Sequence, residues 1–107
     1  MNRGEVVWLR SLRGLQGREQ RGAHFAVIVQ STELLTLSTV VVAPTSTGAL
    51  PATFRPEIEV EGARTRVMVD HLAAVDLSRI GQSVRMLTWD EMSEVDKALD
   101  ILLGLAR

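Results

Sequence analysis

The residues best suited to chemistry lie in a basic, glycine-punctuated stretch. Between Arg10 and His24 the chain carries three glycines and four arginines. Residues 1–24 hold five arginines against two glutamates, whereas residues 88–107 hold five acids against two basic residues. A locally basic surface attracts phosphates even on a nearly neutral protein. Imidazole exchanges protons near neutral pH, so His24 could act as a general acid or base. A solvated arginine loop and a merely accommodated histidine are the alternative interpretations.

Other chemistries are disfavoured by composition. The 107 residues include no cysteine and only two histidines, which argues against a thiolate or histidine metal site, and no cofactor is expected. No apolar run reaches the length of a membrane span, and the first residues lack the apolar segment of a secretory signal. We therefore expect one domain over residues 1–107 that acts in the cytoplasm, away from membranes.

The elements that must position these residues are mostly short strands. β-Branched and aromatic residues predict strands over residues 5–9, 25–29 and 39–43, the last stopped by Pro44. Residues 52–54, 58–60 and 65–69 read as edge or hairpin strands, with a turn at Glu61 and Gly62. Several short strands at close spacing favour a barrel.

One long helix is predicted at the C-terminus. Thr88 and Glu91 fit a capping box, and Leu87 with Met92 fits a hydrophobic staple. Apolar residues at helical spacing then form a stripe that should pack on the barrel, and Gly104 is a plausible stop; the stripe consists of Met92, Val95, Leu99 and Leu102. A shorter helical turn is expected after Asp76, whose side chain can cap it.

Four collinear segments resemble the MazF/PemK/Kid family of toxin endoribonucleases. They are residues 3–8 (Arg-Gly-Glu-Val-Val-Trp), 17–22 (Gly-Arg-Glu-Gln-Arg-Gly), 42–47 (Val-Ala-Pro-Thr-Ser-Thr), and Val69-Asp70 with residues 75–79 (Val-Asp-Leu-Ser-Arg). The closing helix is also similar to that of the family. The resemblance covers nearly the whole chain and implies a mainly β fold, an SH3-like β-barrel of the CcdB/MazF toxin type with a C-terminal helix.

The resemblance implies metal-independent cleavage of single-stranded RNA. The ribose 2′-hydroxyl attacks its own phosphodiester and leaves a 2′,3′-cyclic phosphate and a 5′-hydroxyl. The family uses chiefly an Arg after the glycine-rich loop and a Thr after Val-Ala-Pro-x, and the aligned positions here are His24 and Ser46. Serine preserves a hydroxyl, but a neutral imidazole lacks the fixed charge of guanidinium, which Arg21 could supply. Catalysis by His24, Ser46 and Arg21 is therefore a hypothesis.

Further residues are predicted to bind RNA. They are Arg10, Arg13, Arg18, Glu19, Gln20, Thr45, Thr47, Asp70 and His71. His71 and Ala73 stand where the family usually has Gln and Arg, and a structural His71 is an equally good interpretation. Thr45 and Thr47 could instead satisfy the turn after Pro44. Trp8 and Trp89 invite base stacking, although core or dimer packing is the stronger interpretation for both.

The resemblance also implies partners. A homodimer would hold RNA in its interface groove, and a cognate MazE-like antitoxin would occupy that groove with an acidic, flexible segment. A second function class remains open, namely a non-catalytic binding toxin on the same fold, either gyrase-directed or cleavage-deficient. The altered catalytic position favours this second class, whereas the Glu-Gln loop and the Val-Ala-Pro segment favour the nuclease.

Overall fold

The computed structural model describes residues 1–10 and 24–105. In chain order the strands and the helix are β1 (Glu5–Leu9), β2 (Phe25–Ile28), β3 (Thr39–Ser46), β4 (Glu57–Val60), β5 (Ala63–Val67), β6 (Ala73–Asp76), β7 (Ile80–Met86) and α1 (Trp89–Leu103). Three single turns of 3-10 helix join them: η2 (Thr32–Leu34), η3 (Val69–His71) and η4 (Leu77–Arg79).

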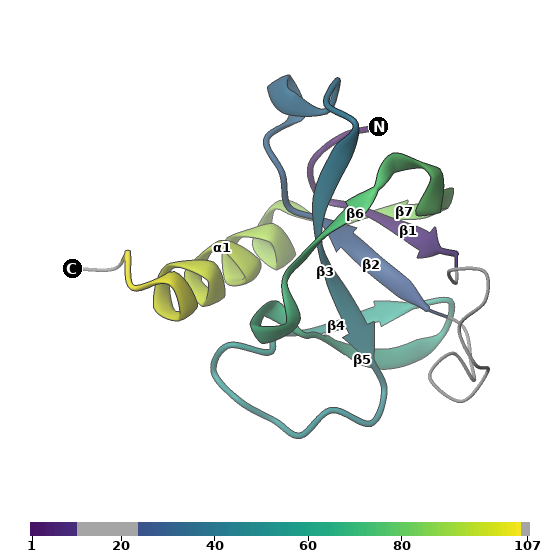
Figure 1. Cartoon of the computed structure of the whole chain (residues 1–107). Coiled ribbons are helices and arrows are strands. Elements are labelled where there is room, and N and C mark those ends of the chain that lie inside the picture. The colour runs from purple at the N-terminus through teal and green to yellow at the C-terminus, as the bar shows by residue number, and fades with distance from the viewer. Residues whose placement is uncertain (11–23, 106–107) are drawn as a thin grey trace.

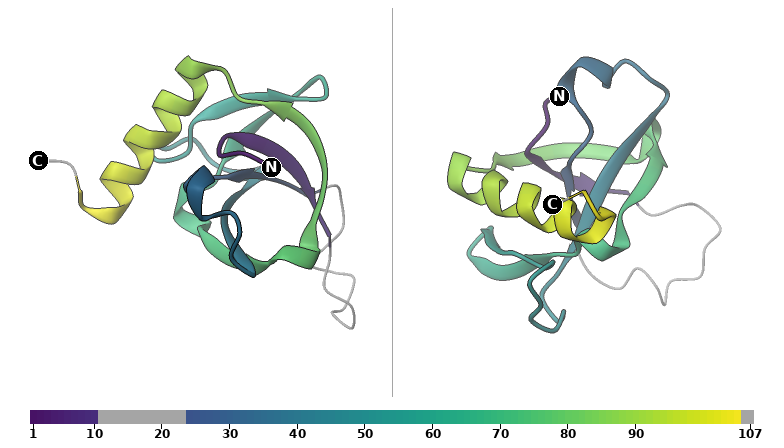
Figure 2. Two further views of the ribbon diagram at one scale, coloured as in Figure 1. Left: turned by 90° about the horizontal axis from the view of Figure 1, so that it is seen from above. Right: turned by 90° about the vertical axis from the view of Figure 1, so that its left-hand side faces the viewer.

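The strands form one strongly curled antiparallel sheet (Figures 1 and 2). Its strand order is β4-β5-β3-β2-β1-β7, and β6 pairs with β3 off this path. The long strand β3 changes partner along one edge, since β6 pairs with Thr39–Val42 and β5 pairs with Thr45 and Ser46. This change of partner bends the sheet into a part-closed barrel.

Two apolar clusters occupy the two faces of the curled sheet. One lies beneath α1 and combines Val27, Ala43 and Val67 with Val95 and Ala98 of the helix. The other is made by alternate residues of the same strands, including Ala26, Ile28, Val40 and Val42. Side chains of successive strand residues point to opposite faces, which is why neighbours in sequence divide between the clusters.

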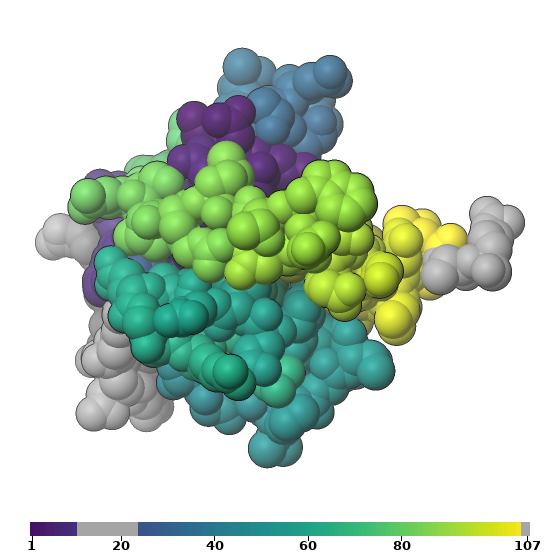
Figure 3. All heavy atoms as spheres, turned by 180° about the vertical axis from the view of Figure 1, so that it is seen from behind, coloured from purple at the N-terminus to yellow at the C-terminus, as the bar shows by residue number. Residues whose placement is uncertain are grey.

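Helix α1 lies across the back of the barrel, between the N-terminal residues and the β4–β5 hairpin (Figure 3). The predicted capping box is confirmed, because Thr88 Oγ1 accepts from the Glu91 N–H at 3.1 Å and the Glu91 carboxylate accepts from the Thr88 N–H at 2.8 Å. Gly104 ends the helix with a φ of 72°. The predicted apolar stripe buries Val95 and only partly covers Leu102, because the last turns project beyond the barrel.

The structure corrects three sequence predictions. Strand β3 continues through Pro44 to Ser46, residues 52–54 form a turn rather than a strand, and β5 ends at Val67, two residues before the predicted end. Strands β6 and β7 were not predicted. The short helical turn after Asp76 is present, with Asp76 Oδ1 accepting from the Ser78 N–H at 2.9 Å.

Pro44 is tolerated inside β3 because of where its missing N–H falls. The Pro44 carbonyl accepts from the Met68 N–H at 2.7 Å, on the edge that faces β5 and β6. In a strand the N–H and C=O of one residue point to the same edge, so the absent donor also faces this edge. Strand pairing with β6 ends at Val42 and pairing with β5 begins at Thr45, so no ladder bond is lost there.

Among residues 1–10 and 24–105, no helix is both long and apolar enough to cross a bilayer. Within the same ranges, no group of three or more histidine or acidic side chains is arranged to hold a metal ion.

Candidate functional site

His24 and Ser46 stand at the adjoining ends of two neighbouring strands, because His24 directly precedes β2 and Ser46 is the last residue of β3. The β2–β3 register pairs Ala26 with Pro44, and each candidate lies two residues further toward the same end of the pair. A hydrogen bond of 3.2 Å from the Thr45 hydroxyl to the Phe25 carbonyl shows that the two chains stay together there. Directly opposed residues share a face of the sheet, with Cβ atoms about 5 Å apart. The two predicted catalytic side chains therefore lie on one surface.

This pair is part of a longer line of polar side chains. Ser46 pairs with Arg66 of β5, and Arg66 pairs with Glu57 of β4. The four residues His24, Ser46, Arg66 and Glu57 thus stand side by side across four neighbouring chain segments, and we name them the polar row. On the other side of His24, its carbonyl accepts from the Leu9 N–H at 2.8 Å, so an apolar residue borders the row.

The Ser46 hydroxyl is held with its proton available. Its oxygen accepts a hydrogen bond from the Gly48 N–H at 3.2 Å, and Ser46 is half-buried at the end of β3. A hydroxyl that already accepts from the backbone can still donate its own proton to an anion. The flanking threonines differ: the Thr45 hydroxyl donates to the Phe25 carbonyl of β2 rather than to the turn after Pro44, and Thr47 is exposed beyond the strand.

Asp70 is held by an arginine that sequence reasoning did not single out. Arg55 Nη2 and Nε donate to the two carboxylate oxygens at 2.7 and 3.1 Å. These hydrogen bonds from Arg55 lower the pKa of Asp70 below its usual range. His71 is exposed, with Nε2 3.6 Å from the same carboxylate. Asp70 is therefore occupied within the protein, whereas His71 is free to meet a ligand.

Arg55 joins this ion pair to the polar row, because Arg66 Nη1 donates to the Arg55 carbonyl at 2.9 Å. Asp70 and His71 accordingly lie at the β5 side of the row, and Met68 connects the intervening backbone to Pro44. Among the predicted RNA-binding residues that the structure describes, those from β3 and from the segment after β5 therefore lie near the β3–β5 pairing.

Arg10 lies at the end of β1 and is tied to the following turn. Its Nη1 donates to the carbonyls of Ser78 and Ile80, at 2.8 and 3.0 Å. Its own carbonyl accepts from Arg79 Nε at 2.7 Å. This arginine supports the segment around η4, and the residue as a whole is exposed. The other predicted residues from the basic stretch, Arg13, Arg18, Glu19, Gln20 and Arg21, lie outside the described residues.

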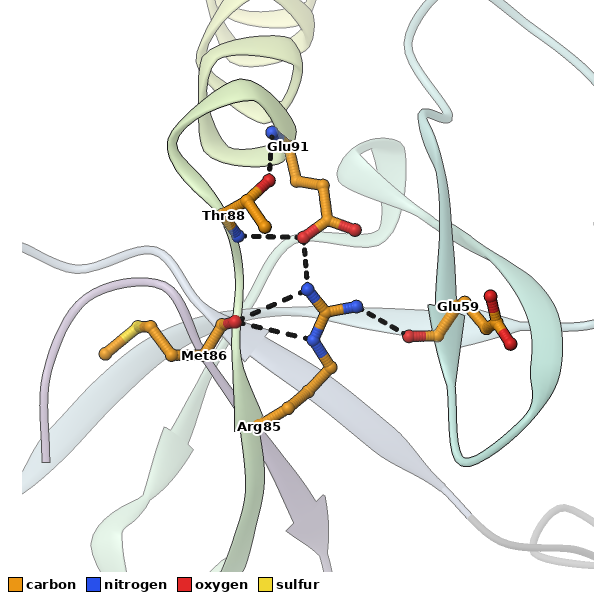
Figure 4. Close-up of polar contacts among 5 residues, drawn as sticks. All are labelled: Glu59, Arg85, Met86, Thr88 and Glu91. Carbon is orange, nitrogen blue, oxygen red and sulfur yellow. Dashed lines mark hydrogen bonds and ion pairs between the residues drawn. The ribbon is translucent and has the colours of Figure 1, made fainter.

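A second polar cluster fixes the start of α1 (Figure 4). Arg85 donates to the Glu91 carboxylate, to the Glu59 carbonyl at 2.7 Å and to the Met86 carbonyl at 3.4 Å. Burial alone would raise the pKa of Glu91, but hydrogen bonds from Thr88 and Arg85 outweigh it and lower that pKa. We name Arg85, Thr88 and Glu91 the helix clamp, since they join β7, α1 and the β4–β5 hairpin.

A shallow hollow lies between the hairpin and the helix clamp. Its volume is about 260 Å³, and its lining is Glu57, Ile58, Glu59, Arg64 and Glu91. Three carboxylates against one guanidinium would repel a nucleic-acid backbone. The hollow therefore borders the polar row without extending a phosphate-binding surface.

Both tryptophans are exposed in the chain, so core packing accounts for neither of them fully. Trp8 packs edge-to-face on Phe25, with ring centroids 5.3 Å apart. The Trp8 backbone and side chain also lie close to Gly81 of β7. Trp89 lies in the first turn of α1 and is 82% exposed, so it does not pack in the core of the described chain.

Comparison with known proteins decides the family. The model of the PemK-like, MazF-like toxins of type II toxin-antitoxin systems matches residues 2–103. The chain belongs to this family. The family resemblance expected from the four sequence segments is thereby confirmed.

Named relatives agree with this assignment. The chain is 43% identical over 91 residues to a Mycobacterium tuberculosis protein named as a toxin, covering 84% of this chain and 85% of that one. It is 32% identical over 112 residues to the endoribonuclease MazF of Staphylococcus epidermidis, covering 98% and 92%.

Solved structures confirm the fold. The Mycobacterium tuberculosis toxin MazF-mt6 matches with a TM-score of 0.79 at 13% identity, over 96% of this chain and 99% of that one. MazF from Deinococcus radiodurans matches with a TM-score of 0.77 at 24% identity, over 97% and 96%. The expected barrel of the MazF toxin type, with its C-terminal helix, is therefore correct.

Proposed function

We propose that this MazF-like toxin is a metal-independent endoribonuclease that cleaves single-stranded RNA through the ribose 2′-hydroxyl. The observation that carries the proposal is the opposed placement of His24 and Ser46 on one face, at the edge of the barrel where the basic stretch enters β2. Its relatives named endoribonuclease MazF support the reaction class.

The reaction needs a base, an acid and stabilisation of the phosphorane. The 2′-oxygen forms a bond to phosphorus, the bond from phosphorus to the 5′-oxygen breaks, the 2′ proton leaves, and the 5′-oxygen gains a proton. Within the polar row, His24 is the candidate for the proton transfers, because an imidazole can serve as a general acid or base. The Ser46 hydroxyl donates to a non-bridging phosphate oxygen. Arg21 is a further candidate for binding the phosphate.

The test is cleavage of varied single-stranded RNAs by the purified protein in excess EDTA, with both product ends mapped. We expect 2′,3′-cyclic phosphate and 5′-hydroxyl ends. A strand with a single 2′-deoxy sugar at the cut position should bind and remain intact, because it lacks the attacking group. The double variant His24→Ala, Ser46→Ala, purified identically, excludes a contaminating nuclease.

Absence of cutting across varied RNAs, with and without divalent metal, would contradict the proposal. That result would favour the alternative of a binding toxin, directed at gyrase or deficient in cleavage. Binding of RNA without cutting would separate these two.

We further propose that the toxin acts in the cytoplasm as a homodimer inhibited by a cognate MazE-like antitoxin. A mycobacterial endoribonuclease solved in complex with its cognate antitoxin matches this fold with a TM-score of 0.79. Exposed apolar side chains at the end of α1, namely Ile101, Leu102, Leu103 and Leu105, suit a surface that another chain covers. Light scattering should give twice the chain mass of 11.8 kDa, and a monomer at micromolar concentration would contradict the dimer.

A further inference from the structure

In the proposed reaction negative charge develops on the phosphate. Two neutral side chains such as His24 and Ser46 stabilise that charge only weakly. His24 in its neutral form and Ser46 each offer one N–H or O–H donor. Stabilisation of a developing oxyanion is usually the largest single contribution to such catalysis, and a guanidinium provides it with a permanent charge and several donors. The polar row contains one guanidinium, that of Arg66, directly opposite Ser46.

Arg66 is placed on the same face as Ser46 by the strand pattern. Its neighbours Thr65 and Val67 are buried, so alternation turns the Arg66 side chain to the outer face. Opposed pairs of an antiparallel ladder share a face, which places the stem of Arg66 about 5 Å from Ser46 at Cβ. In the structure the guanidinium points toward Arg55 and Glu57, and a change of its side-chain rotamer from this Cβ position would bring it to a phosphate held at the Ser46 hydroxyl.

The guanidinium is oriented but not saturated. Nη1 donates to the Arg55 carbonyl at 2.9 Å, Nη2 lies 3.8 Å from a Glu57 oxygen, and the side chain is 24% exposed. Arginine has five N–H donors. Within the described residues Arg66 makes this one hydrogen bond, which leaves donors for a ligand. A side chain anchored at one nitrogen loses less rotamer freedom on binding an anion.

The neighbouring arginines are less suited to this role. Arg55 directs Nε and Nη2 to Asp70 and Nη1 to the Leu50 carbonyl. Arg64 lies two residues before Arg66 in β5, and its side chain is 81% exposed. Of the described arginines near Ser46, Arg66 thus combines proximity, a fixed orientation and free donors.

We infer that Arg66 binds the non-bridging oxygens of the scissile phosphate beside Ser46 and stabilises the charge that develops there. This inference rests on the proposed endoribonuclease function. Arg66 stays protonated throughout and exchanges no proton, so the proton transfers described above are unchanged.

The experiment compares Arg66→Gln, Arg66→Lys and the matched control Arg64→Gln in single-turnover cleavage of one RNA. Loss of one such donor group costs about 10²- to 10³-fold in rate, so Arg66→Gln should fall by that factor with a smaller change in KM. Arg66→Lys keeps the positive charge but loses the planar set of guanidinium donors. Its cleavage rate should therefore lie between those of the wild type and Arg66→Gln. Arg64→Gln should cleave like the wild type, because the Arg64 side chain is 81% exposed and its guanidinium pairs with Glu57 rather than standing opposite Ser46.

A phosphorothioate substrate separates contact from mere support of the fold. Sulfur at the non-bridging position that Arg66 contacts should slow the wild type, and the same stereoisomer should slow Arg66→Gln much less, since the interaction is already absent. A structural role would leave this sulfur effect unchanged. Thermal unfolding of each variant shows that the fold persists, and Arg66→Lys gives the same comparison if Arg66→Gln does not fold.

The experiment distinguishes failure of the Arg66 proposal from failure of the endoribonuclease proposal. A wild-type protein that cuts no RNA overturns both. A wild type that cuts, with Arg66→Gln equal to Arg64→Gln or with an undiminished sulfur effect, overturns the role of Arg66 alone.

Discussion

The polar row and the helix clamp flank the same β4–β5 hairpin, and each contains one arginine. In the clamp, all three nitrogen atoms of Arg85 donate within the protein, to Glu91, to the Glu59 carbonyl and to the Met86 carbonyl (Figure 4). In the row, the contacts of Arg66 with other described residues are one hydrogen bond and one longer ion-pair contact. The two arginines have nearly equal exposure, 26% and 24%. What separates them is how many donors the protein itself uses.

This difference indicates a division of roles. A guanidinium whose donors are all satisfied holds chain segments together, and removing it leaves the polar groups it satisfied without partners. A guanidinium with free donors at a half-exposed edge is satisfied by water, which a phosphate can replace. We therefore expect changes in the row to reduce catalysis with little effect on folding, and changes in the clamp to do the reverse.

The largest effect is expected from His24→Ala. Loss of a general acid or base lowers rates by about 10²- to 10⁴-fold, so cleavage per folded molecule should fall within that range. The thermal midpoint should stay within experimental error of the wild type, because His24 is half-exposed at the row's edge. Single-turnover rates, measured from pH 5 to 9 alongside circular dichroism melts, provide the check.

His24→Gln is the matched control, since it keeps a polar side chain that cannot exchange a proton near neutral pH. It should be as slow as the alanine variant. Cleavage at the wild-type rate in either variant would show that His24 is only accommodated at the strand start, and proton transfer would have to be assigned elsewhere.

Arg85→Gln should have the second-largest effect, on stability. It removes the donors to Glu91 and to the Glu59 carbonyl, and charged hydrogen bonds contribute about 1.5 to 3 kcal/mol each. We expect the free energy of unfolding to drop by about 2 kcal/mol, measured by urea denaturation. The cleavage rate per folded molecule should be unchanged. A stable but inactive variant would break the proposed division between clamp and row.

The sequence predicted those site residues that belong to local motifs, and it did not predict residues that only strand pairing brings together. His24 and Ser46 were identified from segments that resemble the family, and the capping box at Thr88 follows from spacing along a single helix. Arg66 was not identified, because its importance depends on the register of β5 against β3, which brings together residues 20 positions apart. No local signal specifies such a pairing. The buried Thr65 and Val67 would have oriented Arg66, but not placed it beside Ser46.

The same limit explains the errors in the fold. A proline usually ends a strand, yet β3 continues through Pro44. The N–H that Pro44 lacks would lie where the partner of β3 changes from β6 to β5, so no strand-pairing bond is lost. Strand β7 was missed because most of its residues are polar or small and at least partly exposed, which gives no alternating apolar pattern. Strand β7 approaches β1 closely at Gly81, because a Cβ added there would lie 2.9 Å from the Trp8 carbonyl oxygen. This glycine is therefore the residue in β7 that indicates the pairing.

Within the clamp, Thr88→Ala should have a smaller effect than Arg85→Gln. The Thr88 hydroxyl satisfies one N–H at the start of α1, and loss of such a cap costs about 1 kcal/mol. Thr88→Ser keeps the hydroxyl and should restore most of the stability. If alanine and serine were equally stable in urea, the hydroxyl would contribute nothing to the helix start.

The smallest effect concerns acid pH, through Glu91. Because the pKa of Glu91 is lowered in the folded chain, its ionised form stabilises the fold above the unfolded value near 4.5, and this contribution is lost as pH falls through the folded value. Glu91→Gln retains a capping side chain but not the charge that Arg85 faces. Its stability should therefore lie less than about 1 kcal/mol below wild type at pH 7 and converge with it as the pH falls below 4.5 and through the folded pKa of Glu91. Urea titrations of both proteins from pH 3 to 7, with Glu94→Gln on the exposed face of α1 as control, measure this convergence. A constant difference across the range would mean that the charge of Glu91 does not strengthen the clamp, and that Arg85 stabilises the hairpin through the Glu59 carbonyl alone.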